Sequence, residues 1–203
     1  REIPLEQVLS IDFFTVHPQA YWEWFAQENA REGVAPNAAH RFVADLERAG
    51  KLSAVVTQNI DGLHQRAGSE RVLELHGNWS RLICTGCDEH FTLDDVDDAR
   101  SGEVPHCPVC ASVLRPDIVF YGEMLDSEVM EGAVRAISEA DLLIVAGTSL
   151  VVYPAAGLID YYTGERLVLM NATPTPYDSR ADLVIREPVG QVFEELGRRS
   201  RQP

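Results

Sequence analysis

Four cysteines occur as two Cys-x-x-Cys pairs, Cys84 with Cys87 and Cys107 with Cys110. Two intervening residues let one tight turn present both thiolates to a single ion, and a second turn completes a tetrahedron. A disulfide framework would need an oxidising compartment, and the opening "REIPLEQVLS" does not resemble a secretory signal. A Cys-x-x-Cys redox motif needs one pair and not two. The spacing therefore predicts a zinc site, which is structural because four thiolates fill the coordination sphere.

A second group of polar residues follows short apolar runs. The segment "TQNID" follows Val55 and Val56, and other apolar runs end at His76-Gly77, at Gly147-Thr148-Ser149 and at Asn171. Because the carboxyl ends of parallel strands share one edge of a sheet, we expect these groups to lie along that edge. Gly147 permits close approach of a ligand, and hydroxyls beside it can hold phosphate or ribose. Together these ends predict a dinucleotide-binding crevice.

The elements that must position these residues alternate between strand and helix. Such alternation predicts an α/β fold, a Rossmann-like doubly wound parallel sheet. Turns, cysteines and acidic residues replace this pattern at 79–114, which we predict to be a small inserted zinc-ribbon module with four cysteine ligands. Residues 1–78 and 115–203 would then form the Rossmann-like domain, with a helical segment near 12–50. Helices are expected within 35–50, 126–140, 154–164 and 189–199, and strands within 52–59, 71–77, 141–150, 165–171 and 181–185.

The composition excludes some partners. The net charge is -15, from 32 acidic and 17 basic residues, which argues against direct nucleic-acid binding because phosphate contacts need Lys and Arg. No run approaches the roughly 20 apolar residues of a membrane span. We therefore expect a cytoplasmic protein with no membrane partner.

Several longer strings occur together in the order found in sirtuins, the NAD-dependent protein lysine deacylases. The sequence resembles this family from about Ile11 to Leu196. Sirtuins also carry a Gly-Ala-Gly cofactor loop ahead of the part that matches Arg1, and we expect NAD binding to need that segment. The matching strings are "TQNIDGLHQRAG", "ELHGNW", the two cysteine pairs, "LRPDIVFYGEML", "GTSLVVYPAAG" and "NATPTP".

The resemblance implies a reaction and a set of catalytic residues. Acetyl would pass from lysine of a peptide or protein to ADP-ribose with release of nicotinamide, and the cofactors would be NAD and one structural Zn²⁺. His76 matches the general base, a role that suits an imidazole near neutral pH. Asp61 and Ile60 match the residues that bind the nicotinamide carboxamide, Asn59 positions the ribose and a water, and Gln58 contacts the same ribose.

The resemblance also implies binding residues beyond the catalytic group. Thr148, Ser149 and Asn171 match the positions that hold the adenosine half of NAD, beside Gly147, and Val189 matches a position that lines the adenine. The remaining matches form the acyl-lysine channel and the edges between which a substrate peptide adds as a strand: Val119, Phe120, Tyr121, Gly122 and Val151. The aromatic residues Tyr21, Trp22, Trp24 and Phe25 are expected in the core or the channel wall.

Two other functions compete with deacetylation. A mono-ADP-ribosyltransferase would use the same NAD pocket with a different acceptor. A non-catalytic zinc-ribbon module would only bind a partner. The strings "HGNW" and "VFYGE" favour deacylation because they match the lysine channel, and the net charge of -15 argues against a nucleic-acid-binding ribbon.

Overall fold

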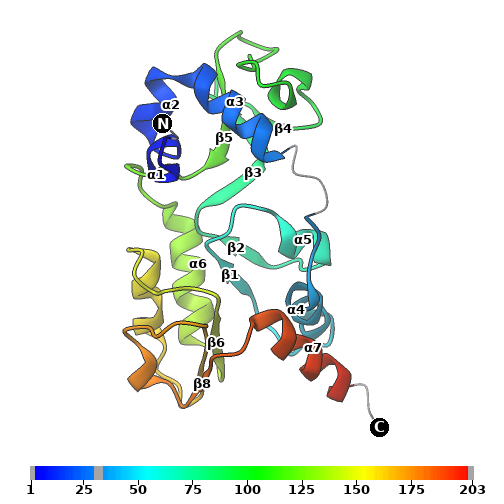
Figure 1. The fold of residues 1–203 in the computed structure, drawn as a ribbon, viewed down its shortest axis with the longest axis vertical. Helices are drawn as coiled ribbons and strands as arrows, with labels where there is room; N and C mark the ends of the chain where they lie inside the picture. The colour runs from blue at the N-terminus through cyan, green and yellow to red at the C-terminus, as the bar shows by residue number, and fades with distance from the viewer. Residues whose placement is uncertain (1–2, 30–33, 201–203) are drawn as a thin grey trace. The chain divides into compact units, whose positions relative to one another are not determined.

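The computed structural model describes residues 3–29 and 34–200, and the chain forms two compact units (Figure 1). The cysteine-bearing unit comprises Arg1–Val34, Asn59–Gly62 and His76–Leu125. The parallel-sheet unit comprises Ala35–Gln58, Leu63–Leu75 and Asp126–Pro203. The chain thus passes from one unit to the other at Gln58 and at Leu75, next to predicted site residues. The boundaries 79–114 for a separate zinc module remain a prediction.

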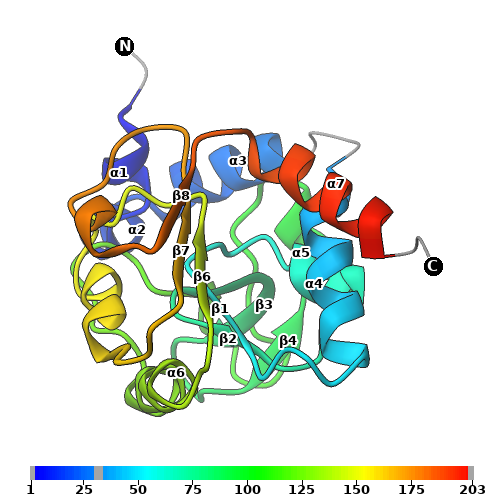
Figure 2. The ribbon, with the colours of Figure 1, turned by 90° about the horizontal axis from the view of Figure 1, so that it is seen from below.

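The parallel-sheet unit contains the predicted alternation of strands and helices. Strands β1 (Val55–Thr57) and β2 (Val72–Glu74) pair in parallel. Strands β6 (Leu143–Ala146), β7 (Leu167–Met170) and β8 (Leu183–Ile185) form a second parallel sheet in that order, visible side by side in Figure 2. The central strand β7 is the most buried of the three, as expected for a strand covered on both edges.

The helices of this unit begin where the sequence provides caps. The Asn37 side chain accepts hydrogen bonds from the N–H groups of Ala39 and His40, which starts α4 (Ala38–Arg48). Asp126 caps α6 (Ser127–Ser138) in the same way. Helix α7 (Val189–Ser200) lies beside α4 (Figure 2), where the rings of Phe42 and Phe193 are 5.5 Å apart. The shorter elements are α5 (Leu63–Ala67), η2 (Ala155–Tyr161) and η3 (Asp178–Arg180).

One predicted helix has a different form. Residues 155–161, expected to be α-helical after Pro154, form the 3₁₀ helix η2. Four apolar residues of this short segment, Ala155, Ala156, Leu158 and Ile159, are buried. Buried Leu158 and Ile159 pack with Leu167 and Leu169 of β7, so tertiary packing and not local propensity decides this element.

The cysteine-bearing unit combines short helices with an antiparallel sheet. Strand β3 (Gly77–Cys84) lies between β4 (His90–Thr92) and β5 (Leu114–Ile118). Its core is aromatic, with Tyr21, Trp22 and Phe25 of α3 all buried, which confirms the expectation for these residues. The remaining elements are α1 (Leu5–Val8), α2 (Ile11–Val16), α3 (Pro18–Asn29) and η1 (Asp97–Arg100).

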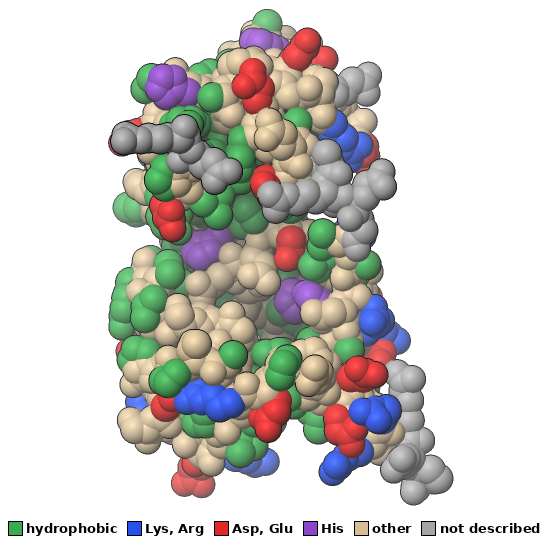
Figure 3. Space-filling view, viewed as in Figure 1, with side chains coloured by type: hydrophobic (Ala, Val, Ile, Leu, Met, Phe, Trp, Pro, Cys, Tyr) green, Lys and Arg blue, Asp and Glu red, His purple; other side chains and the backbone are tan. Residues whose placement is uncertain are grey.

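On the face of the molecule seen in Figure 3, basic side chains lie among acidic ones. In the space-filling view, Lys and Arg side chains alternate with Asp and Glu side chains over α4 and α7 (Figure 3). These exposed pairs, such as Arg199 with Glu195 at 2.8 Å, each contribute little to stability. Across the described ranges, no helix combines the length and the apolar character needed to cross a membrane.

Candidate functional site

The four cysteine sulfurs converge on one point of the cysteine-bearing unit. All four Sγ atoms lie within 4.8 Å of one another, with Cys84 and Cys110 3.4 Å apart and Cys87 and Cys107 3.7 Å apart. A tetrahedron with Zn–S bonds of about 2.3 Å has edges of roughly 3.8 Å. None of the four forms a disulfide. The cluster therefore has the ligand type, number and spacing of a structural zinc site.

Backbone and side-chain groups around the cluster support thiolates. The N–H groups of Gly86 and Val109 lie 3.3 and 3.4 Å from the sulfurs of Cys84 and Cys107. Hydrogen bonds with the side chain and backbone of Ser112 lower the pKa of Cys110 to about 6. A backbone hydrogen bond at Glu89 acts to lower the pKa of Cys87, but neighbouring thiols raise it to about 12. A bound cation would favour the thiolate form of all four sulfurs.

His76 lies in the same unit at the junction before β3, where its neighbour fixes the backbone. The carbonyl of His76 accepts a hydrogen bond from the N–H of Val119 at 3.0 Å. Gly77 has φ +75°, and a Cβ there would lie 2.1 Å from the carbonyl oxygen of Asp117. Only glycine fits such a close approach at positive φ. The His-Gly pair is therefore a turn whose geometry places the imidazole-bearing residue against β5.

The segment Asn59–Gly62 is also attached to β3. The N–H of Trp79 donates to the carbonyl of Ile60 at 3.1 Å. The buried Asn78 side chain accepts from Ser80, and its amide nitrogen would lie 3.2 Å from a Cβ built at Gly62. Asn59 is exposed, while Ile60 and Asp61 are half-buried. The unit therefore brings the predicted nicotinamide residues and His76 to the start of one strand.

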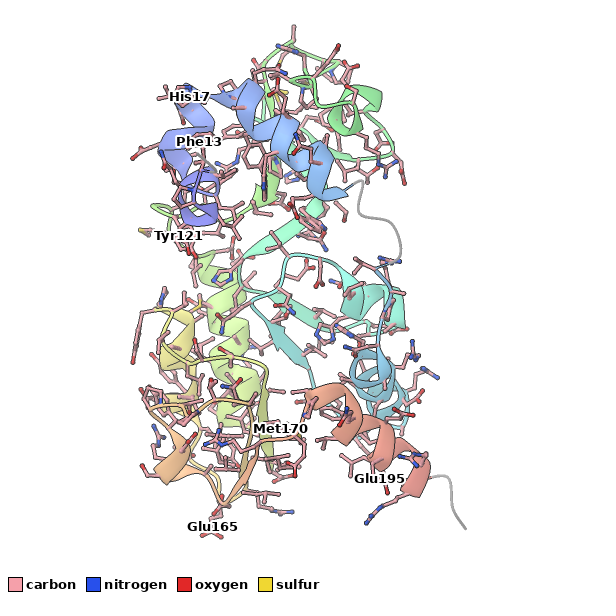
Figure 4. The ribbon with its side chains drawn as sticks, viewed as in Figure 1. Phe13, His17, Tyr121, Glu165, Met170 and Glu195 are labelled. Carbon is pink, nitrogen blue, oxygen red and sulfur yellow. The ribbon has the colours of Figure 1, made fainter. Side chains whose placement is uncertain are left out.

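The predicted acyl-lysine segment runs alongside these residues. Tyr121 is 53% exposed and lies beside the N-terminal helices, where Figure 4 labels Phe13 and His17. Its N–H donates to the carbonyl of Leu9 at 2.8 Å, and its own carbonyl accepts from Ile11 at 3.1 Å. Phe120 is instead buried at 1% exposure in the aromatic core. Adjacent side chains of this segment thus point into the core and toward solvent.

The predicted adenosine residues lie in the parallel-sheet unit, after β6 and β7. Gly147 has φ +68° with open space where a Cβ would stand, and its N–H donates to the carbonyl of Met170 at 2.9 Å. The Thr148 hydroxyl lies 3.5 Å from the amide nitrogen of Gln58 and accepts from the N–H of Leu150 at 3.2 Å. The ends of β1, β6 and β7 are thereby brought together, as the sequence predicted.

Asn171 is supported by a residue that the sequence reasoning missed. Arg186, just after β8, donates to the carbonyls of Asn171 and Thr173, each at 2.9 Å, and pairs with Asp178. Hydrogen bonds from Thr175 and then from Arg186 lower the pKa of Asp178, although burial opposes the shift. In the sequence, the only indication of this role is that Arg186 directly follows the apolar run at the end of the predicted strand 181–185.

The remaining predicted residues lie at or near the surface. They are exposed Ser149, exposed Gly122, half-buried Val189 at the start of α7, and Val151, which is 59% exposed.

The chain is similar to known proteins over most of its length. The Sir2 family model matches residues 3–154. An NAD-dependent protein deacetylase of Clostridium acetobutylicum is 48% identical over 193 residues, which span 95% of this chain and 78% of that protein. A solved structure described as "Sir2-p53 peptide-NAD+" matches with a TM-score of 0.86 and 40% identity over 98% of this chain and 85% of the other. Another, "Sir2 bound to acetylated peptide", matches with a TM-score of 0.85 and 41% identity, covering 96% and 83%. The predicted Rossmann-like fold class is confirmed.

Proposed function

This chain belongs to the Sir2 family, and on that premise we propose that it is an NAD-dependent protein lysine deacetylase. The observation that carries the proposal is the extent of the match. Relatives with this activity and structures with acetylated peptide or NAD are similar over nearly the whole chain at 40% identity or more. Similarity on this scale covers both the cysteine-bearing unit and the parallel-sheet unit.

Within this reaction, His76 is the proposed general base. When bound, NAD supplies an electrophilic ribose carbon and a leaving group, nicotinamide. An imidazole at the start of β3 can take a proton from a ribose hydroxyl near neutral pH. Its hydrogen bond with Val119, the residue after β5, keeps its backbone in one place, and fixed geometry of this kind lowers the cost of reaching the transition state.

Two groups of residues would hold the two ends of NAD. Asn59, Ile60 and Asp61 would bind the nicotinamide end, since a carboxylate accepts from an amide NH₂ and an asparagine can both donate and accept. Gln58 would contact the adjoining ribose. The adenosine half falls to Gly147, Thr148, Ser149, Asn171 and Val189. Arg186 supports this group by holding the carbonyl of Asn171.

Val119, Phe120, Tyr121, Gly122 and Val151 are the residues we propose for the acetylated peptide. The buried ring of Phe120 anchors the segment in the core. Acetylated lysine peptides are thus the proposed partner class. The zinc ion, held by Cys84, Cys87, Cys107 and Cys110, plays no chemical part because its four ligands leave no open position.

The experiment combines the zinc-loaded protein with NAD and a peptide carrying one acetyl-lysine. Mass spectrometry should find free nicotinamide, deacetylated peptide and acetylated ADP-ribose in equal amounts. The same peptide without the acetyl group is the control and should release no nicotinamide. ADP-ribose attached to protein, with the acetyl group left in place, would establish the transferase alternative instead. Binding of the peptide without any nicotinamide release would favour a binding module.

A further inference from the structure

Arg115 and Glu123 form an ion pair whose side chains are only 18% and 24% exposed. Nη1 of Arg115 lies 2.6 Å from Oε1 of Glu123, and Nη2 lies 2.7 Å from Oε2. This parallel, two-pronged arrangement is the strongest geometry available to an arginine and a carboxylate. Both residues belong to the cysteine-bearing unit.

The pair encloses the short segment between its two members. Nη2 of Arg115 also donates to the carbonyl of Ile118 at 2.9 Å, and Oε2 of Glu123 accepts from the N–H of Phe120 at 2.9 Å. The guanidinium lies over the Phe120 ring, 4.8 Å from its centroid. The ion pair thus contacts the backbone of the segment at two points, and its guanidinium covers the buried ring of Phe120.

The enclosed segment is attached to its neighbours on both sides. Val119 donates to His76, and Tyr121 exchanges backbone hydrogen bonds with Leu9 and Ile11. The Phe120 ring packs against Phe14 and Tyr21 with centroids 5.3 and 5.4 Å away. Three consecutive residues therefore have three different anchors, and that of the middle residue includes the ion pair.

We propose that the Arg115–Glu123 pair is a positioning device for the substrate segment at 119–122. It rests on the proposed function, because that function makes these residues the acetylated-peptide site. The pair holds the segment in its binding conformation before the peptide arrives, which reduces the ordering cost of binding. Neither side chain needs to touch the substrate.

The test uses two conservative variants of the full chain. Arg115→Lys keeps the positive charge and loses the two-pronged geometry, while Glu123→Gln keeps the shape and loses the negative charge. Arg81→Gln is the matched control. Arg81 of β3 pairs with Asp117 of β5 at 2.9 Å, but it is 42% exposed and lies outside the 118–123 network. The double variant Arg115→Lys/Glu123→Gln completes a double-mutant cycle.

The readouts are the Kd of an acetyl-lysine peptide, by fluorescence anisotropy, and amide hydrogen exchange over 119–123. Each single variant should weaken peptide binding by about 10-fold, equivalent to about 1.4 kcal/mol. Each should also speed exchange of the Phe120 amide, with zinc content unchanged. The double variant should be no weaker than the worse single one, because both changes remove the same interaction. Arg81→Gln should stay within about 2-fold of the unmodified protein.

Two results would overturn the inference. One is unchanged peptide affinity in both single variants. The other is effects that simply add in the double variant, as for two residues that stabilise the fold independently. If Arg115→Lys fails to fold, Glu123→Gln alone decides, through the same affinity and exchange measurements. Failure of the unmodified protein to bind any acetylated peptide would count against the proposed function, while the exchange data would still decide whether the pair orders 119–123.

Discussion

At the scale of single residues, the proposed site depends on backbone constraints as well as on side-chain chemistry. His76 can hold its place because the next residue, Gly77, has a conformation that other residues avoid, and any Cβ there would lie 2.1 Å from the carbonyl oxygen of Asp117. The carbonyl of His76 is bound to Val119. The proposed base is thus placed through its backbone by the residues on either side of it in the fold.

Replacing His76 by alanine should abolish chemistry without abolishing binding. We expect His76→Ala to lose deacetylation by about 100-fold or more, the usual effect of removing a positioned acid or base. NAD binding should persist, because the proposed binding groups lie on other residues. Calorimetric titration with NAD, beside product assays, checks both halves. Turnover near that of the unmodified protein would remove His76 from the mechanism.

The Arg115–Glu123 pair should make stability depend on pH in a defined direction. Burial acts to raise the pKa of Glu123, but hydrogen bonds from Arg115 and from the Phe120 N–H lower it below its usual value. A depressed pKa in the folded state gives stability above the unfolded pKa, about 4.3, that is lost as pH falls through the folded value. The advantage in unfolding free energy over Glu123→Gln should thus be constant above about pH 5 and shrink below it.

Denaturant unfolding of both proteins between about pH 3 and pH 7 measures this difference. Loss of zinc by thiolate protonation affects both proteins alike and cancels in the comparison. A difference that grows as the pH falls would contradict the assigned direction of the pKa shift.

At the scale of elements, the zinc ligands come from two turns that the antiparallel sheet brings together. Cys84 ends β3, and Leu114, which starts β5, pairs with it across the sheet. The second cysteine pair lies just before β5, where the N–H of Ala111 donates to the carbonyl of Cys107 at 2.8 Å. The hydrogen bonds of the sheet and the metal site therefore reinforce each other.

Removing one ligand should disrupt this arrangement. We expect Cys110→Ser to lose the metal and to lower the melting temperature, because three thiolates leave an incomplete coordination sphere and zinc binding is coupled to folding. Elemental analysis and thermal unfolding give the two readouts. Full zinc content with unchanged melting would show that Cys110 is not a ligand.

At the scale of the whole molecule, the two units have separate hydrophobic cores. The core of the cysteine-bearing unit includes buried Cys84 and Cys107 beside its aromatic residues. The core of the parallel-sheet unit is built around Leu167 and Leu169 of β7, and all four cysteines lie in the other unit. Zinc should thus directly stabilise the core that contains the cysteines.

Removing the metal should lower the local stability of the cysteine-bearing unit more than that of the parallel-sheet unit. After chelation of zinc, amides of β3 and β5 should exchange at least about 100-fold faster, while amides of β7 keep their protection, because local stability differs between cooperative units. Hydrogen exchange with mass spectrometry, before and after chelation, makes the comparison. Equal loss of protection in both units would show that they unfold as one.

The sequence alone determined the features that depend on local spacing. Two Cys-x-x-Cys pairs predicted a four-thiolate site, and the capping residue Asn37 marked where a helix begins. Polar residues after apolar runs placed Thr148 and Asn171 at strand ends. The order of the longer strings indicated the family, which the comparisons confirmed.

Only the tertiary structure decided contacts whose partners are distant in sequence or whose packing overrides local preference. Arg186 reaches the carbonyl of Asn171 because β8 lies beside β7, and the sequence contains no sign of that register. Which of Phe120 and Tyr121 faces the core depends on how the 119–121 segment is anchored to Leu9 and His76. Residues 155–161 form a 3₁₀ helix because their packing in the core overrides their local preference. Short-range rules act through covalent neighbours, whereas these outcomes depend on surfaces that exist only after the chain has folded.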